Sequence, residues 1–202
     1  ICAGMILFNI VTALLSRRRA HRFHRRSTRF EKEISRELDR LAETGEVSAE
    51  HLRRMEHKLR RVNNMVTYDQ ALDRLLPCRP ALVRDYLLAS SGVVVTLAED
   101  YCRRDEIESA YFPYLIKKYR LLSGESCPEL KAMLLDLLHE PSLYCRENTM
   151  QAIYTSGDPV LVVQALQIIN ADSYYYSGKL LSDGLLNYTG SSQVLAYALW
   201  CV

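Results

Sequence analysis

The sequence lacks the short motifs that mark most enzymes. It contains no glycine-rich phosphate loop, no GxSxG nucleophile elbow and no GxGxxG fingerprint. A zinc site would need a carboxylate or cysteine at matching spacing, and none accompanies the histidines. We expect His21, His24, His51 and His57 to be solvated surface residues and His139 to lie at a helix end. We therefore expect no catalytic residue, no metal site and no cofactor, and a protein that is not an enzyme.

Paired cysteines are also absent. The six cysteines lie at positions 2, 78, 102, 127, 145 and 201, without a CxxC motif and without the spacing of a small disulfide framework. We expect them to be buried, reduced thiols in a cytoplasmic protein.

Residues 1–15, ICAGMILFNIVTALL, contain no charge. A bilayer-spanning helix needs about 20 apolar residues, so we expect this run to be the truncated end of a transmembrane helix. A buried amphipathic helix is the alternative, whereas a signal peptide would end in small residues instead of arginines. The chain starts with Ile1 and stops inside an apolar run, and we expect it to be a segment of a longer protein.

A basic patch follows the apolar run, with no acidic residue among its arginines. It consists of Arg17, Arg18, Arg19, Arg22, Arg25, Arg26 and Arg29. Arginines next to a membrane helix hold that end in the cytoplasm and attract anionic headgroups, which places the residues after 16 on the cytoplasmic side. The alternative is a nucleic-acid-binding surface over residues 17–61, but only Phe23 and Phe30 interleave with the arginines as stacking groups.

Residues 16–79 form the expected basic juxtamembrane connector. Phe30, Ile34, Leu38 and Leu41 follow the spacing of one apolar helix stripe. We expect Ser48 to cap a second helix, and a capping box at residues 67–70 to open a third, which ends near Pro77.

Residues 80–202 are self-similar. Gly92, Gly124, Gly157 and Gly190 recur at a nearly constant interval, and each follows a serine or threonine. A period of about 33 residues is typical of stacked helical repeats. The pattern predicts about four helical pairs, namely 80–91 with 93–103, 107–122 with 127–139, 142–155 with 159–170, and 174–188 with 192–202. The expected fold class is therefore all-α.

The best-formed unit contains the hinge Ser156-Gly157-Asp158-Pro159, in which glycine suits the end of one helix and Pro159 the start of the next. With Arg146 early in the first helix and the apolar run 160–169 in the second, this unit resembles the short bacterial HEAT-like repeat of the phycobilin lyase type. The Trp/Tyr/Gly pattern of TPR repeats and the T-P-L-H turn of ankyrin repeats are absent. The resemblance implies a right-handed α-solenoid with a concave groove, in which Arg146 ties neighbouring repeats together.

HEAT-like arrays mostly bind proteins, sometimes nucleic acid, and occasionally carry chemistry, as in the lyases. Tyrosine occurs 13 times, and Tyr174, Tyr175 and Tyr176 form a possible protein interface or pack on the preceding repeat. The resemblance and the apolar run together imply a membrane-anchored, cytoplasmic scaffold for a protein partner in the same membrane. The nucleic-acid-binding function is the second hypothesis. A lyase-like enzyme, which requires an acidic or histidine cluster in the groove, is the third.

Overall fold

The computed structural model describes residues 2–104, 106–122, 128–172, 176 and 178–201, and the chain is all-helical, with no strand in these ranges. Gly124, Tyr174 and Tyr175 lie outside the described residues. The chain divides into two compact units, Ile1–Tyr86 and Leu87–Val202, and each is described by itself.

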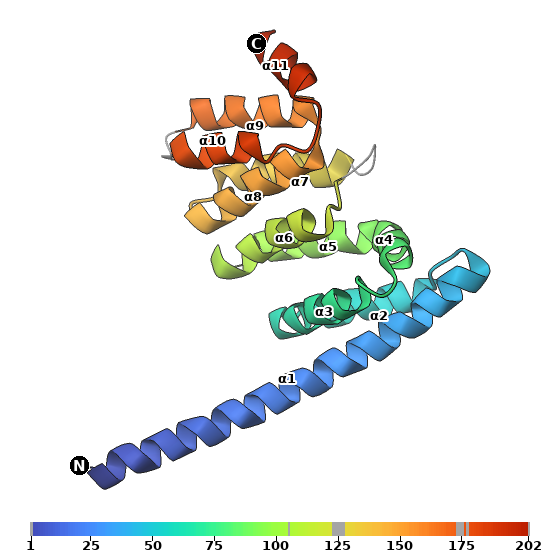
Figure 1. Cartoon of the computed structure of the whole chain (residues 1–202), viewed down its shortest axis with the longest axis vertical. Coiled ribbons are helices and arrows are strands. Elements are labelled where there is room, and N and C mark those ends of the chain that lie inside the picture. Colours follow the sequence, from blue (N-terminus) through green and yellow to red (C-terminus); the bar gives the residue numbers. More distant parts are fainter. Residues whose placement is uncertain (1, 105, 123–127, 173–175, 177, 202) are drawn as a thin grey trace. The chain divides into compact units, whose positions relative to one another are not determined.

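The first unit is built on one long helix. Helix α1 runs without interruption over Cys2–Thr44, and it is followed by α2 (Ala49–Leu59), α3 (Val62–Leu75) and α4 (Pro80–Ala89) (Figure 1). The predicted apolar stripe from Phe30 to Leu41 is confirmed, because all four of its side chains are buried. Helix α1 packs on α3 along this stripe and ends at Gly45, whose φ of 74° is left-handed.

The predicted capping box at residues 67–70 is wrong. Helix α3 begins at Val62, so Thr67 lies inside the helix, where its hydroxyl is fully buried. Its Oγ1 donates to the carbonyl oxygens of Asn63 at 3.0 Å and Asn64 at 2.9 Å. A threonine that bonds back to the preceding turn has no need to cap a helix, which explains why the local pattern misleads.

The second unit contains seven α-helices in its described residues. They are α5 (Ser91–Cys102), α6 (Glu106–Tyr119), α7 (Pro128–Asp136), α8 (Leu143–Ser156), α9 (Pro159–Ala171), α10 (Gly178–Leu186) and α11 (Ser192–Trp200). A short 3-10 helix, Leu137–His139, extends α7. The predicted helix positions from residue 80 onward are confirmed to within a few residues at each end.

Alternate helices of the second unit contact one another. Helix α8 packs against both α6 and α10, while α5 contacts α7, α7 contacts α9, and α9 contacts α11. Helices α8 and α10 lie side by side in Figure 1. Helices α6, α8 and α10 therefore form one row of contacting helices, and α5, α7, α9 and α11 form a second.

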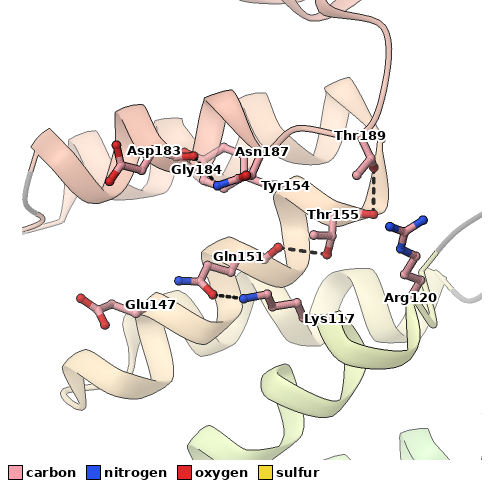
Figure 2. A pocket seen from close by; sticks show the side chains of 10 residues that line it. All are labelled: Lys117, Arg120, Glu147, Gln151, Tyr154, Thr155, Asp183, Gly184, Asn187 and Thr189. Carbon is pink, nitrogen blue, oxygen red and sulfur yellow. Dashed lines mark hydrogen bonds between the residues drawn. The ribbon is translucent and has the colours of Figure 1, made fainter.

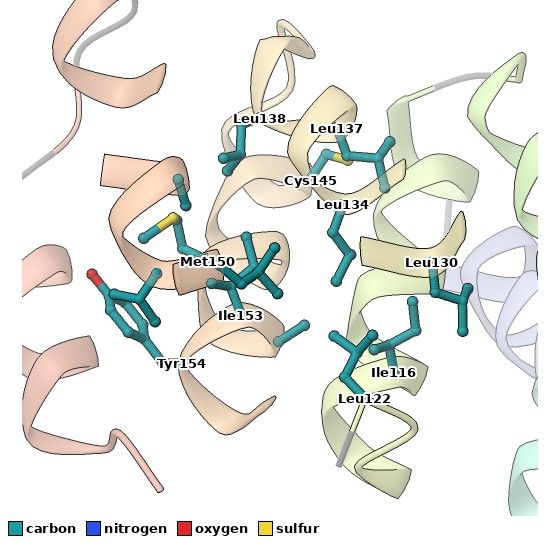
Figure 3. Close-up of a cluster of buried hydrophobic side chains, with 14 of the residues drawn as sticks. Ile116, Leu122, Leu130, Leu134, Leu137, Leu138, Cys145, Met150, Ile153 and Tyr154 are labelled. Atoms are coloured by element: carbon teal, nitrogen blue, oxygen red, sulfur yellow. The ribbon is translucent and has the colours of Figure 1, made fainter. Parts of the chain in front are cut away.

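An apolar core fills the space between the two rows (Figure 3). Its largest contributions are leucines from α7 and the 3-10 helix, together with Met150, Ile153 and Tyr154 of α8. At about 25 cal/mol per Å², each fully buried side chain of this kind contributes about 2 kcal/mol. The far end is less covered: Leu195 of α11 is buried, but Tyr197 and Trp200 are exposed.

No single helix in the described part of the chain combines the length and hydropathy of a bilayer span. The bent pair α4 and α5 meets those two criteria only when both helices are taken together.

Candidate functional site

The hinge between α8 and α9 has the predicted structure. Gly157 ends α8 with a left-handed φ of 74°. Asp158 then caps α9, since its Oδ1 accepts the backbone N–H groups of Val160 and Leu161 at 3.0 and 3.2 Å. Pro159 follows in the first turn of α9, where its missing N–H costs nothing.

The residues that follow α10 contact this hinge directly. Tyr188 donates its hydroxyl to the carbonyl oxygen of Gly157 at 2.8 Å, and Thr189 donates to the carbonyl oxygen of Thr155 at 3.0 Å. A Cβ added to Gly190 would come within 2.4 Å of the Gly157 oxygen. Two of the predicted repeat glycines are therefore in contact, and a side chain at position 190 would separate them.

A groove of about 610 Å³ opens beside this contact, across α6, α8 and α10 (Figure 2). Most of its lining residues are of polar types, and they are Lys117, Arg120, Glu147, Gln151, Tyr154, Thr155, Asp183, Gly184, Asn187 and Thr189. We call it the polar groove.

Helical periodicity brings these residues to one side. Glu147, Gln151 and Tyr154 are spaced four and three positions apart on α8, so they share a face. Asp183 and Asn187 do the same at the end of α10, where the Asn187 amide donates to the Asp183 carbonyl at 2.8 Å. Lys117 of α6 donates a hydrogen bond to Gln151 Oε1, which joins α6 to α8 across the groove.

The charges of the polar groove are separated. Figure 2 shows Glu147 and Asp183 at one end and Arg120 at the other. Arg120 has a φ of 50°, which makes it the one non-glycine residue with left-handed backbone in the described ranges. Strained backbone of this kind is common at binding sites, where it directs a side chain that a regular helix end would place elsewhere.

Tyr154 forms the floor of the groove. Its ring is buried, and its hydroxyl donates to the Leu181 carbonyl oxygen at 3.5 Å. Burial raises the pKa of Tyr154 to about 12, so the phenol stays neutral near pH 7. Neither a phenolate base nor a phenolate nucleophile is therefore present here.

The lining is chemically suited to binding. Its carboxylates are Glu147 and Asp183, and no histidine or cysteine is among the lining residues. Within the described ranges, no three His, Cys, Asp or Glu side chains are placed to hold a metal ion. What the groove offers a ligand is therefore a set of hydrogen-bonding amides and hydroxyls between two charged ends.

Arg146 is not among the groove residues; it lies in the first turn of α8, and its side chain extends back to the residues that precede this helix. It is buried, and its Nη1 donates to the carbonyl oxygens of Glu140 at 2.8 Å and Pro141 at 2.7 Å. Its guanidinium carbon lies 5.2 Å from the centre of the Tyr176 ring. Tyr176 is buried too and donates to the Leu138 carbonyl oxygen at 3.0 Å, so it packs on the 3-10 helix and does not form a surface.

Other predicted positions also differ from expectation. Gly92 is exposed in the first turn of α5 and closes no helix. His51, expected at the surface, is buried, with its Nε2 2.9 Å from the Tyr86 hydroxyl. Cys145 is buried as expected, but Cys78 and Cys201 are exposed.

All seven arginines of the basic patch are exposed on α1. None of them joins an ion pair within the described part of the chain. The acids of α1 that form ion pairs come later in the helix: Glu31 pairs with Arg74 of α3, Glu33 with Lys58 of α2, and Asp39 with Arg79. The patch therefore presents its charge to solvent.

Sequence analysis missed the groove residues, although one pattern could have found them. Lys117, Gln151 and Gly184 recur at almost the same interval as the repeat glycines. They lie on α6, α8 and α10, so testing the same interval at other positions would have aligned them.

The chain matches no family model, and neither a curated protein nor a solved structure matches it significantly.

Proposed function

We propose that this chain is a membrane-anchored scaffold of HEAT-like repeats that binds a protein partner along the polar groove. The groove itself carries the proposal. It crosses α6, α8 and α10, which are the first helices of three successive pairs. A partner lying along it would contact every one of these pairs once, as binding surfaces of stacked repeats allow.

Two observations support a solenoid of repeated helical pairs. Alternate helices pack in two rows, so each pair contacts mainly the pairs beside it. The contact of Gly157 with Gly190 also places two hinges, one repeat apart in the sequence, on top of one another. Repeats that stack in register produce this kind of hinge-to-hinge contact.

The lining favours an extended peptide segment as the bound part of the partner. The carboxamides of Gln151 and Asn187 can each donate and accept, which matches the N–H and C=O groups of an exposed main chain. Glu147 and Asp183 at one end suit a basic residue of the partner. The charges thereby set the direction in which the segment lies.

The first unit supports membrane attachment. Met5, Val11 and Leu15 are 63%, 45% and 49% exposed on the apolar part of α1, so no other described element covers them. The basic patch follows immediately on the same helix, and arginines beside a membrane helix favour a cytoplasmic side for the rest of the chain.

A pull-down from detergent-solubilised membranes tests the proposal, with the full chain as bait and copurifying proteins quantified by mass spectrometry. The groove variant Glu147→Gln/Asp183→Asn removes the acidic end. The matched control is Gln164→Lys/Gln167→Lys on α9, in the other row, where both residues are exposed. Both double variants change the net charge by the same amount, because two lost carboxylates equal two added lysines.

We expect a partner that wild type and the α9 control retain, and that the groove variant loses about tenfold, the effect of about 1.4 kcal/mol. Equal retention by all three proteins contradicts binding in the groove. If no protein copurifies reproducibly and the chain fractionates away from membranes, both halves of the proposal are wrong.

A further inference from the structure

A second hollow, of about 590 Å³, lies in the first unit between α1 and α3. It is lined by Arg19, Ala20, Arg22, Phe23 and Arg26 of α1 and by Asn63 of α3. We call it the arginine hollow. Three of the seven arginines of the basic patch line it, together with the aromatic ring of Phe23 and the side-chain amide of Asn63.

Helical spacing explains why these arginines converge. Arg19, Arg22 and Arg26 are three and four positions apart, so they follow one side of α1. Phe23 lies half-buried next to them, on the border of the stripe that packs on α3. The arginines therefore line the hollow together with an apolar ring, and no described carboxylate pairs with them.

The amino end of α3 contributes to the same place. Arg61 precedes α3 without a capping bond from its side chain, and Asn63 lies in the first turn. The partial positive charge of a helix amino end adds to the charge of the three arginines. The arginine hollow is thus positive on both of its walls, and Asn63 supplies a neutral donor between them.

The position of the hollow along α1 points to the membrane surface. At a rise of about 1.5 Å per residue, Arg19 lies about 6 Å beyond Leu15 and Arg26 about 16 Å beyond it. The headgroup layer on each side of a bilayer is about 5 to 7 Å thick. Arg19 would then lie at the level of the lipid phosphates. Side chains on a helix tilt toward its amino end, so those of Arg22 and Arg26 would extend back toward the same layer.

We propose that the arginine hollow binds the headgroup of an anionic lipid that carries more than one phosphate. Three guanidinium groups spread along one side of α1 match several phosphates better than one, and each can bind a phosphate through two parallel hydrogen bonds. The inference rests on the membrane attachment proposed above and names the lipid chemistry at that surface.

Single-stranded nucleic acid offers the same phosphates, but it also needs aromatic side chains for its bases. Phe30 is only 6% exposed and packs edge-on against Tyr68, with the ring centres 6.0 Å apart. Phe23 is left as the single ring beside the arginines of the hollow. The aromatic content therefore favours a lipid headgroup over a base-stacked strand.

Native mass spectrometry of the detergent-solubilised full chain tests this assignment. The lipid probes are cardiolipin, with two phosphates in one headgroup, and phosphatidylglycerol, with one, at equal phosphate concentration. The test variant is Arg19→Ala/Arg22→Ala/Arg26→Ala, and the matched control is Arg17→Ala/Arg18→Ala/Arg25→Ala, which removes the same charge from the same exposed run. Asn63→Asp places one negative charge in the hollow and keeps every arginine.

We expect wild type to retain cardiolipin about tenfold more tightly than phosphatidylglycerol, and the test variant to lose about tenfold or more of its cardiolipin binding. The control should stay within about threefold of wild type. Asn63→Asp should also lose cardiolipin while remaining folded, because an acid in the first turn of a helix is stabilising. Equal losses from the two triple variants would show a diffuse patch and overturn the proposal.

Two competition arms identify the source of the phosphate. Displacement of cardiolipin by inorganic diphosphate at similar concentration would assign the hollow to a free anion, and tighter binding of a single-stranded oligonucleotide would assign it to nucleic acid. Either result overturns the lipid assignment. Membrane fractionation is read separately: both triple variants should remain with the membrane, and loss of wild type from that fraction counts against the anchor alone.

Discussion

The ring of Tyr154 occupies the space that a side chain at position 184 would need. A Cβ added to Gly184 would come within 2.1 Å of Tyr154 Cε2 and 2.5 Å of its Cδ2. Helix α10 can approach α8 this closely only because residue 184 has no side chain. The depth of the polar groove between the two helices depends on that contact.

Gly184→Ala should therefore destabilise the second unit. The tyrosine ring is buried and cannot move away freely, so we expect a loss of about 1 to 3 kcal/mol in the free energy of unfolding. Urea denaturation followed by circular dichroism measures it.

Gly178→Ala is the control for this substitution. Gly178 begins the same helix and is exposed, and a Cβ added there meets no atom within 4 Å. Alanine there should be neutral or slightly stabilising, because it favours the helix. Equal destabilisation by the two variants would show that helix propensity, and not the contact with Tyr154, decides the result.

Gly157 and Gly45 provide a matched pair for the hinge. Both have a φ of 74°, so alanine at either position should cost about 1 to 2 kcal/mol of backbone strain. A Cβ at Gly45 meets nothing within 4 Å, whereas at Gly157 it lies 3.3 Å from Thr189 Oγ1 and 3.4 Å from the Gly190 nitrogen. Gly157→Ala should cost more, and hydrogen exchange should show faster opening at the end of α10. Identical costs would mean that the stacked hinges contribute nothing.

His51 makes the stability of the first unit depend on pH. Burial lowers the pKa of His51 below its ordinary value of about 6.5. The surrounding charges act in both directions, with Glu37 and Glu33 of α1 raising the pKa and Arg54 and Lys58 of α2 lowering it. The net effect is a neutral imidazole that contacts the Tyr86 hydroxyl of α4.

The direction of this pH dependence follows from proton binding. Below about pH 6.5 the unfolded chain protonates this histidine and the folded unit does so less, so stability falls as the pH decreases from about 7 to about 5. His51→Gln cannot titrate and can still hydrogen-bond to Tyr86, so its stability should depend less on pH across the same range. A wild-type slope that the substitution leaves unchanged would assign the effect to other groups.

Local sequence patterns predicted the helices well, since each depends on residues close in the chain. The hinge at Gly157 and Pro159 is the clearest case, because glycine conformation and the missing proline N–H act within a few positions. The burial of Thr67 and His51 could not be predicted in this way. Their burial depends on how α3 and α4 pack on other helices, which short spacing does not encode.

The polar groove also combines features that nearby residues determine with features that depend on the packing of distant helices. The amphipathic period places Glu147 and Gln151 on one face of α8, which is a local property. That this face meets Lys117 and Asp183 depends on the stacking of helical pairs that are distant in the sequence. For a related reason, the sequence does not decide between an interface and a packing role for Tyr176, because its partner, the Leu138 carbonyl, lies 38 residues earlier in the 3-10 helix.

Because α1 is one continuous helix, the direction in which its arginines point is fixed relative to the apolar stripe that begins at Phe30. Each residue turns a helix by about 100°, so a single insertion between Arg26 and Phe30 would rotate the arginines of the hollow by about a quarter turn relative to the stripe that packs on α3. Inserting a whole heptad would restore the phase to within about 20°. The length of this segment is therefore constrained in steps of two helical turns, even though every arginine in it faces solvent.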